Sequence, residues 1–164
     1  MTYSYGGHRL ISRALKTHAP HVAIMGAAAH YFHENLATGD FHGTISGSWN
    51  YALEPMVDHI QAWRSGNLGE ANRVWPALKK LHGYVHRDKT HHHLRYKIAA
   101  WLRGLIPSPY MRPPMPSPQR DETIMLRDLL KNAGLKVISD KEIDEGLRNV
   151  PRDLQKKPLK AMAS

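Results

Sequence analysis

Histidine is the residue type in this sequence whose clustering could support metal chemistry. The chain has 12 histidines, and His86 is followed closely by the run His91-His92-His93. Imidazole is a common ligand of zinc and nickel. Consecutive residues of a helix, however, point about 100° apart, so three adjacent histidines cannot converge on one ion. We therefore expect adventitious metal binding here and no specific metal site.

A second stretch with chemical potential is Gly43-Thr44-Ile45-Ser46, which follows a glycine turn at Gly39. It is typical of a short buried strand that ends in hydroxyl side chains. The hydroxyls of Thr44 and Ser46 more simply satisfy backbone groups at a strand end than act in catalysis. The chain contains no cysteine, which excludes disulfides and thiol nucleophiles and fits a reducing, cytoplasmic compartment.

Alternating strands and helices should position this stretch. A helix over 8–17 precedes an apolar run at 21–25, which Gly26 closes and which predicts a buried parallel strand. A helix over 27–38 follows, and Gly39 is its expected left-handed stop. A second strand is predicted over 42–46. This alternation is the signature of a parallel βα arrangement.

Downstream of Asn50 the hydrophobic pattern becomes helical throughout. Gly66 should end a first helix, and Asn67 with Glu70 predicts a capping box for a second helix that runs to about residue 85. A third helix is expected over 94–105. A proline-rich connection over 106–118 then leads to a last helix, which Ser117 can cap. The charged remainder reads as a tail with at most one short helix.

Composition excludes some classes of protein. Hydrophobic residues make up 41% and charged residues 23% of the chain, as in soluble globular domains. No apolar run of about 18 residues is present, which excludes a membrane-spanning helix of that length. The net charge of +9 could serve nucleic-acid binding, and it is densest over 79–97. A solvated helix face is the simpler interpretation of that segment.

Five local patterns, in the right order and at similar spacing, resemble the dihydrodipicolinate synthase / N-acetylneuraminate lyase family over about residues 20–136. The patterns are Val22 to Gly26; Gly43-Thr44-Ile45-Ser46 with Asn50 and Pro55; Gly66-Asn67 with Ala71, where Asn67 replaces the usual aspartate; Lys97 before Gly104; and Arg112-Pro113-Pro114-Met115 followed by Leu130 and Ala133-Gly134-Leu135. Each pattern alone is weak, and their order carries the resemblance.

The resemblance implies an α/β fold that comprises the C-terminal part of a TIM (β/α)8 barrel. About the last two or three βα units would be present, because a complete barrel takes about 250 residues and this chain has 164. The expected organisation is a partial barrel over 1–65, a C-terminal helical region over 66–136 and a charged tail over 137–164.

Members of this family are class I aldolases, in which a lysine forms a Schiff base with a 2-oxo acid such as pyruvate. The resemblance places that lysine at or before Met1, because Tyr3 to Leu10 resembles the turn and helix that follow it. The expectation is a truncated lyase chain that needs no cofactor and is inactive alone. Gly26 and Ile45, and less strongly Ser46, are the substrate contacts that the resemblance implies.

Two other functions remain open at this level. The chain could be a non-catalytic interaction module or remnant whose exposed strand edge binds a partner, either a second copy or a complementing chain. Nucleic-acid binding is the least favoured reading, because no recognition-helix or aromatic-strand motif supports it.

Overall fold

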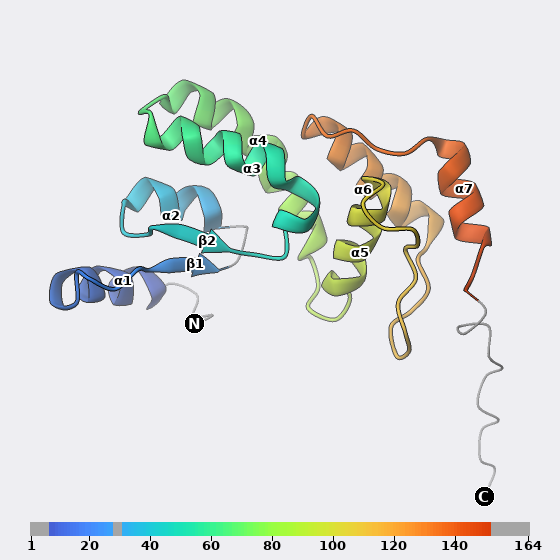
Figure 1. The fold of residues 1–164 in the computed structure, drawn as a ribbon, viewed down its shortest axis with the longest axis horizontal. Coiled ribbons are helices and arrows are strands. Elements are labelled where there is room, and N and C mark those ends of the chain that lie inside the picture. The colour runs from blue at the N-terminus through green and yellow to red at the C-terminus, as the bar shows by residue number, and fades with distance from the viewer. Residues whose placement is uncertain (1–6, 28–30, 152–164) are drawn as a thin grey trace, which may run out of the picture.

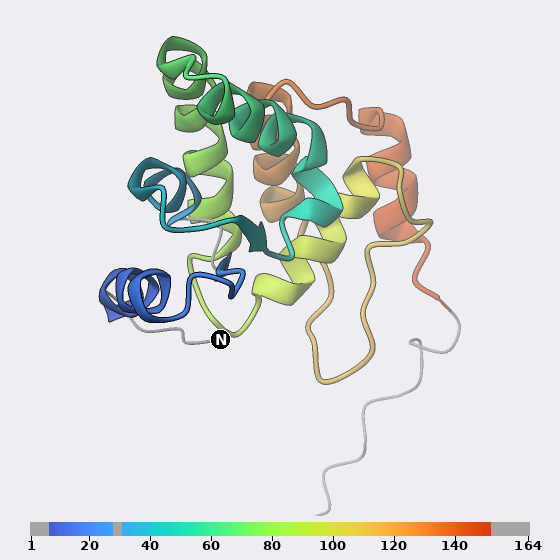
Figure 2. The same cartoon turned by 60° about the vertical axis from the view of Figure 1, so that its left-hand side comes forward.

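The computed structural model describes residues 7–27 and 31–151, in two structurally different parts (Figure 1). The N-terminal part alternates helices with two short strands, and the C-terminal part is helical. The elements are α1 (Gly7–His18), β1 (Met25–Ala27), α2 (Phe32–Thr38), β2 (Gly43–Ile45), α3 (Trp49–Arg64), α4 (Leu68–Val85), α5 (His92–Leu102), α6 (Arg120–Asn132) and α7 (Asp140–Arg148). The views in Figures 1 and 2 both place α1 far from α7.

The strands form a parallel pair, in which Met25 lies opposite Gly43 and Ala27 opposite Ile45. The predicted position of the first strand, 21–25, is wrong. Residues 19–22 form a turn, in which the N–H of Val22 donates to the carbonyl of Ala19 at 3.0 Å. Pairing therefore starts later, and Gly26 lies inside β1 instead of closing it.

Gly39 ends α2 as predicted. Its φ of +66° is left-handed, and its N–H donates to the carbonyl of Leu36 at 3.1 Å. The helix begins at Phe32, later than the predicted residue 27. Residues 25–27 belong to β1, and residues 28–30 lie outside the described residues.

The core of the molecule lies among the helices. Its buried apolar side chains come from α2 to α7 and include Phe32, Met56, Trp75, Leu78, Leu81, Ile98, Leu126, Leu130 and Ile143. The stripe predicted for α4 is confirmed, with Leu78, Leu81 and Val85 fully buried. The Asn67 cap is also present, because its Oδ1 accepts from the N–H of Glu70 at 3.1 Å. The Glu70 carboxylate instead pairs with Arg73.

The buried face predicted for α3 is only partly right. Met56 is fully buried, but Leu53 is half exposed, and Tyr51 and Ala52 are buried in its place. The backbone leaves helical geometry at Ala52, with φ of −129° and ψ of 35°. Pro55 has no N–H to donate to the carbonyl of Tyr51. That carbonyl accepts from Arg103 Nη1 at 2.9 Å instead, and the kink shifts the phase of the first turn.

Residues beyond 136 contain one short helix, which the sequence allowed, and this helix packs on the core. Ser139 and Glu142 make a reciprocal capping box that starts α7, and Ile143 is fully buried. The expected charged tail over 137–164 is therefore a packed helix up to Arg148, and residues 152–164 lie outside the described residues. Helix α6 begins at Arg120 with Gln119 as its N-cap, so the predicted cap at Ser117 is also wrong.

Gly146 lets α7 approach α5 closely, and we expect Gly146→Ala to destabilise the fold. A Cβ at this position would lie 2.2 Å from Cζ2 of Trp101, a buried ring with little freedom to move. The expected loss in the free energy of unfolding is about 1–3 kcal/mol, measurable by urea denaturation.

Gly83→Ala in α4 is the matched control, because nothing lies within 4 Å of its added Cβ. It should raise stability by about 0.5–1 kcal/mol through helix propensity. Equal effects of the two substitutions would contradict the packing of α7 on Trp101.

Candidate functional site

Of the sequence-predicted site residues, Gly26 is the middle residue of β1, Ile45 ends β2, and Ser46 follows it. Gly26 pairs with Thr44, and Ala27 pairs with Ile45. Gly26 and Ile45 therefore lie on neighbouring strands, offset by one residue. The Thr44 hydroxyl donates to the carbonyl of Gly26 at 2.9 Å. Thr44 thus satisfies a backbone group, as the sequence analysis favoured. In parallel barrels the carboxyl edge of the strands is where substrates bind.

Gly26 is buried under α2, where an added side chain would have to displace that of Asn35. A Cβ at this position would lie 2.7 Å from Nδ2 of Asn35 and 3.4 Å from the ring of Phe41. The absence of a side chain therefore lets α2 pack on β1 and leaves the peptide as the group that Gly26 can offer.

Ile45 and Ser46 differ in exposure. Ile45 is 51% exposed, and Ser46 is half-buried. The Ser46 hydroxyl accepts a hydrogen bond from the N–H of Ser48 at 3.2 Å, which fixes the turn into α3. Ile45 thus offers an apolar contact at the strand end, and Ser46 organises the backbone beside it.

A buried polar chain behind this turn was not predicted from the sequence. The Ser48 hydroxyl lies 3.0 Å from the Tyr51 hydroxyl, which lies 3.4 Å from His82 Nδ1 in α4. All three residues are almost fully buried. Burial raises the pKa of Tyr51 far above its ordinary value, and the hydrogen bond with Ser48 opposes that shift. The chain ties the end of β2 to α4.

No lysine lies in either strand or among residues 46–52, which follow β2. Lys16, in the last turn of α1, donates from Nζ to the carbonyl of Gly39 at 2.5 Å. Gly39 precedes β2, so Lys16 lies toward the amino end of that strand. Lys97, in α5, donates to the carbonyl of Tyr110. Neither amine is at the carboxyl edge.

The histidine-rich segment is engaged in internal contacts. Nδ1 of His86 lies 2.8 Å from the carbonyl of His82, and its Nε2 lies 2.6 Å from the Tyr96 hydroxyl. Nδ1 of His92 lies 2.7 Å from the carbonyl of Lys89. Within the described ranges, no three histidine, aspartate or glutamate side chains are placed to hold a metal ion.

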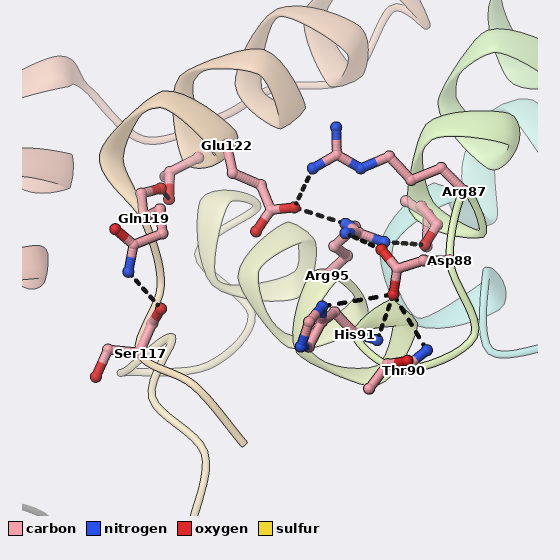
Figure 3. Close-up of polar contacts among 10 residues, drawn as sticks. Arg87, Asp88, Thr90, His91, Arg95, Ser117, Gln119 and Glu122 are labelled. Atoms are coloured by element: carbon pink, nitrogen blue, oxygen red, sulfur yellow. Dashed lines mark hydrogen bonds and ion pairs between the residues drawn. The ribbon is translucent and has the colours of Figure 1, made fainter. Parts of the chain in front are cut away.

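The basic segment over 79–97 is not simply a solvated face. Arg95 is 2% exposed and pairs with Asp88 at 2.5 Å and with Glu122 at 2.7 Å (Figure 3). Arg87 also pairs with Glu122, at 2.9 Å. The hydrogen bond from Arg95 lowers the pKa of Asp88 to about 2. Arg87 and Arg95 thus pair with α6, whereas Lys79, Lys80 and Lys89 are exposed as expected.

Helices long and apolar enough to span a bilayer are absent from the described part of the chain.

Comparisons with known proteins point to one family. Residues 5–133 match the dihydrodipicolinate synthetase family. Over 100 residues the chain is 35% identical to the 4-hydroxy-tetrahydrodipicolinate synthase of Methanopyrus kandleri, covering 61% of this chain and 32% of that protein. The chain thus spans about a third of the length of that relative.

A solved structure shares the fold. YagE, a prophage protein of the dihydrodipicolinic acid synthase family from Escherichia coli K12, was crystallised in complex with pyruvate. It superposes with a TM-score of 0.70 at 24% identity, covering 82% of this chain and 44% of that one. The family match spans most of the chain and includes both strands, α2 and α3 to α6. This chain belongs to the dihydrodipicolinate synthetase family.

Proposed function

We propose that this chain supplies the last βα units and the C-terminal helices of a (β/α)8 lyase barrel, and that it is inactive alone. The observation that supports the proposal is the parallel β1–β2 pair, in which neither strand carries a lysine and none follows β2 among residues 46–52. The reaction is aldol chemistry on a 2-oxo acid such as pyruvate, carried out in the cytoplasm and without a cofactor.

The chemistry explains why an amine at the carboxyl edge is needed. A lysine amine adds to the ketone of the 2-oxo acid, and loss of water gives an iminium. The iminium accepts the electron pair of the carbon–carbon bond that breaks, and it returns that pair when a new bond forms. In this scheme Gly26, Ile45 and Ser46 are substrate contacts, and the amine comes from a complementing segment of the barrel.

A trapping experiment tests this assignment. Borohydride reduces an iminium to a stable amine, which mass spectrometry detects. We expect no such adduct when the chain is incubated with pyruvate and borohydride. A full-length family member treated in parallel should gain one reduced pyruvate. An adduct on any lysine of this chain, Lys16 included, would overturn the account of the missing amine.

A second function, as an interaction module, is favoured by the apolar side chains that the N-terminal part exposes. Leu10 is 76% exposed, and Ile11, Leu15, Met25 and Ile45 are each at least a third exposed. In the described residues, moreover, each strand has only one strand neighbour. Uncovered apolar surface and open strand edges favour association. The partner would be a second copy or a complementing chain.

We therefore expect the chain to self-associate in size-exclusion chromatography coupled to light scattering. Leu10→Glu combined with Leu15→Glu should shift the population toward monomer, because charge on α1 opposes burial of that surface. Leu68→Glu combined with Leu105→Glu is the matched control, since both leucines are more than half exposed, Leu68 at the start of α4 and Leu105 in the loop after α5. A wild-type chain that is monomeric at every concentration would contradict this function.

A further inference from the structure

The N-terminal part contacts the helical part through a group of stacked rings. Helix α2 contributes Phe32 and His33, α3 contributes His59, and α4 contributes Trp75. The ring of His33 stacks on Trp75 with centroids 5.2 Å apart and on His59 with centroids 5.1 Å apart. The ring of Phe32 lies 5.6 Å from that of His59. This aromatic contact holds α2, which itself covers β1, against α3 and α4.

Inside this contact the two histidines lie within hydrogen-bonding distance. Nδ1 of His33 is 3.2 Å from Nε2 of His59. His59 is fully buried, and its ring stacks on Trp75 with centroids 5.5 Å apart. Two neutral imidazoles form such a bond when one nitrogen carries the proton and the other accepts it. The geometry therefore fits a pair of neutral rings.

Few charged groups near the pair could offset the positive charge that an added proton brings. Glu34 on α2 and Lys79 on α4 act on His33 in opposite directions, and the ring of His82 on α4 lies 6.4 Å from that of Trp75. Burial lowers the pKa of His33, Glu34 raises it and Lys79 lowers it. Burial, followed by the charge of His33, lowers the pKa of His59 to about 4, and the backbone of Ala71 opposes this shift.

We propose that the His33–His59 pair is a pH-sensitive contact that holds α2 and the strands against α3 and α4 at neutral pH and releases them in acid. One added proton can be shared between the two facing nitrogens. A second proton puts two positive charges about 3 Å apart, one of them on the fully buried ring of His59, where burial disfavours charge.

The direction of the pH effect follows from proton linkage. A histidine whose pKa is lowered in the packed state binds protons more readily once it is released. The contact therefore contributes its full stability above the ordinary histidine pKa of about 6.5. It weakens as the pH falls from there toward the lowered pKa of His59, which is about 4. Release would uncover Trp75 and shift the strands that carry Gly26 and Ile45.

Hydrogen exchange on the full chain tests the proposal without measuring pyruvate chemistry, so its failure is separate from failure of the proposed function. After correction for intrinsic rates, amides of α2 should lose protection about tenfold more than those of α5 between pH 7.5 and pH 4.5. His59→Phe keeps a ring beside Trp75 but cannot take up a proton, and it should abolish this difference.

Two further variants make the result decisive. His18→Gln, on the exposed end of α1, is the histidine control and should behave like the wild type. His33→Gln removes the like-charge repulsion and serves if His59→Phe does not fold; it should reduce the tenfold difference to about twofold or less. The proposal is overturned if wild-type α2 keeps its protection at pH 4.5, or if the loss persists undiminished in the histidine-pair variants.

Discussion

Arg95→Met is expected to lower the free energy of unfolding by about 3–5 kcal/mol, the range for breaking a buried ion pair by removing one partner. Arg95 is almost fully buried between α4, α5 and α6, where it donates to Asp88, Glu122 and the carbonyl of Val85. Its removal leaves the Glu122 carboxylate, whose side chain is 14% exposed, with only the more exposed Arg87 as a partner. Urea denaturation at pH 7 measures the loss.

A second substitution identifies the source of this loss. Arg95→Met combined with Glu122→Gln should recover part of the stability, because a neutral amide costs less to bury than an unpaired carboxylate. Arg73→Ala is the control: Arg73 pairs with Glu70 on the exposed face of α4, and an exposed pair contributes about 0–1 kcal/mol. Equal losses for Arg95→Met and Arg73→Ala would show that the buried network adds nothing.

The same variant has a spectroscopic signature at Asp88. The hydrogen bond from Arg95 is the largest cause of its lowered pKa, followed by a backbone hydrogen bond from His91. In the Arg95 variant we expect the pKa of Asp88 to rise toward its ordinary value. Because the lowered pKa favours the folded state above the ordinary carboxylate range, this contribution is lost in wild type as the pH falls through about 2. Carboxyl NMR titration detects the change.

The sequence predicted helix stripes well where backbone geometry is regular. Ala71, Leu78 and Val85 recur at helical spacing, and all three are fully buried in α4. It failed where one residue changes the geometry. In α3 the backbone is kinked at Ala52, three residues before Pro55. The buried face there carries Tyr51 and Ala52 instead of the predicted Leu53. A pattern based on helical period cannot anticipate that change.

The candidate site was partly accessible from the sequence. Gly26 and Ile45 were identified by resemblance, and the strand register places them on neighbouring strands, one residue apart. Their role as substrate contacts remains a prediction. The Ser48–Tyr51–His82 chain and the His33–His59 pair join residues that are distant in sequence, so only the packing of α2, α3 and α4 brings them together.

The charged segment after residue 136 shows a different limit. Its acidic and basic residues predicted a tail with at most one short helix, and the Ser139–Glu142 capping box was a readable signal for the start of that helix. A single buried side chain, Ile143, then anchors the helix to the core. The charged residues of α7 show only that one of its faces is exposed. They do not show whether its other face packs on the core.

Ile143→Ala is therefore expected to lower the free energy of unfolding by about 2–5 kcal/mol, as other large-to-small substitutions at fully buried sites do. The loss has two parts. One is the hydrophobic transfer free energy of the removed methyl and methylene groups, and the other is the cost of the cavity left between α7 and the core. A frayed tail would show no loss, so thermal or urea unfolding separates the two descriptions.

Met125→Ala in α6 is the control for Ile143→Ala, because its side chain is 49% exposed and should contribute less than about 0.5 kcal/mol.

The slope of the urea transition gives a further criterion. If α7 belongs to the cooperative unit, Ile143→Ala should move the midpoint and leave the slope unchanged. A reduced slope would mean that α7 detaches before the rest unfolds, and the helix would then be a separate, weakly held segment. A lowered midpoint with an unchanged slope would make α7 part of the folded core, which the charge pattern of this segment does not reveal.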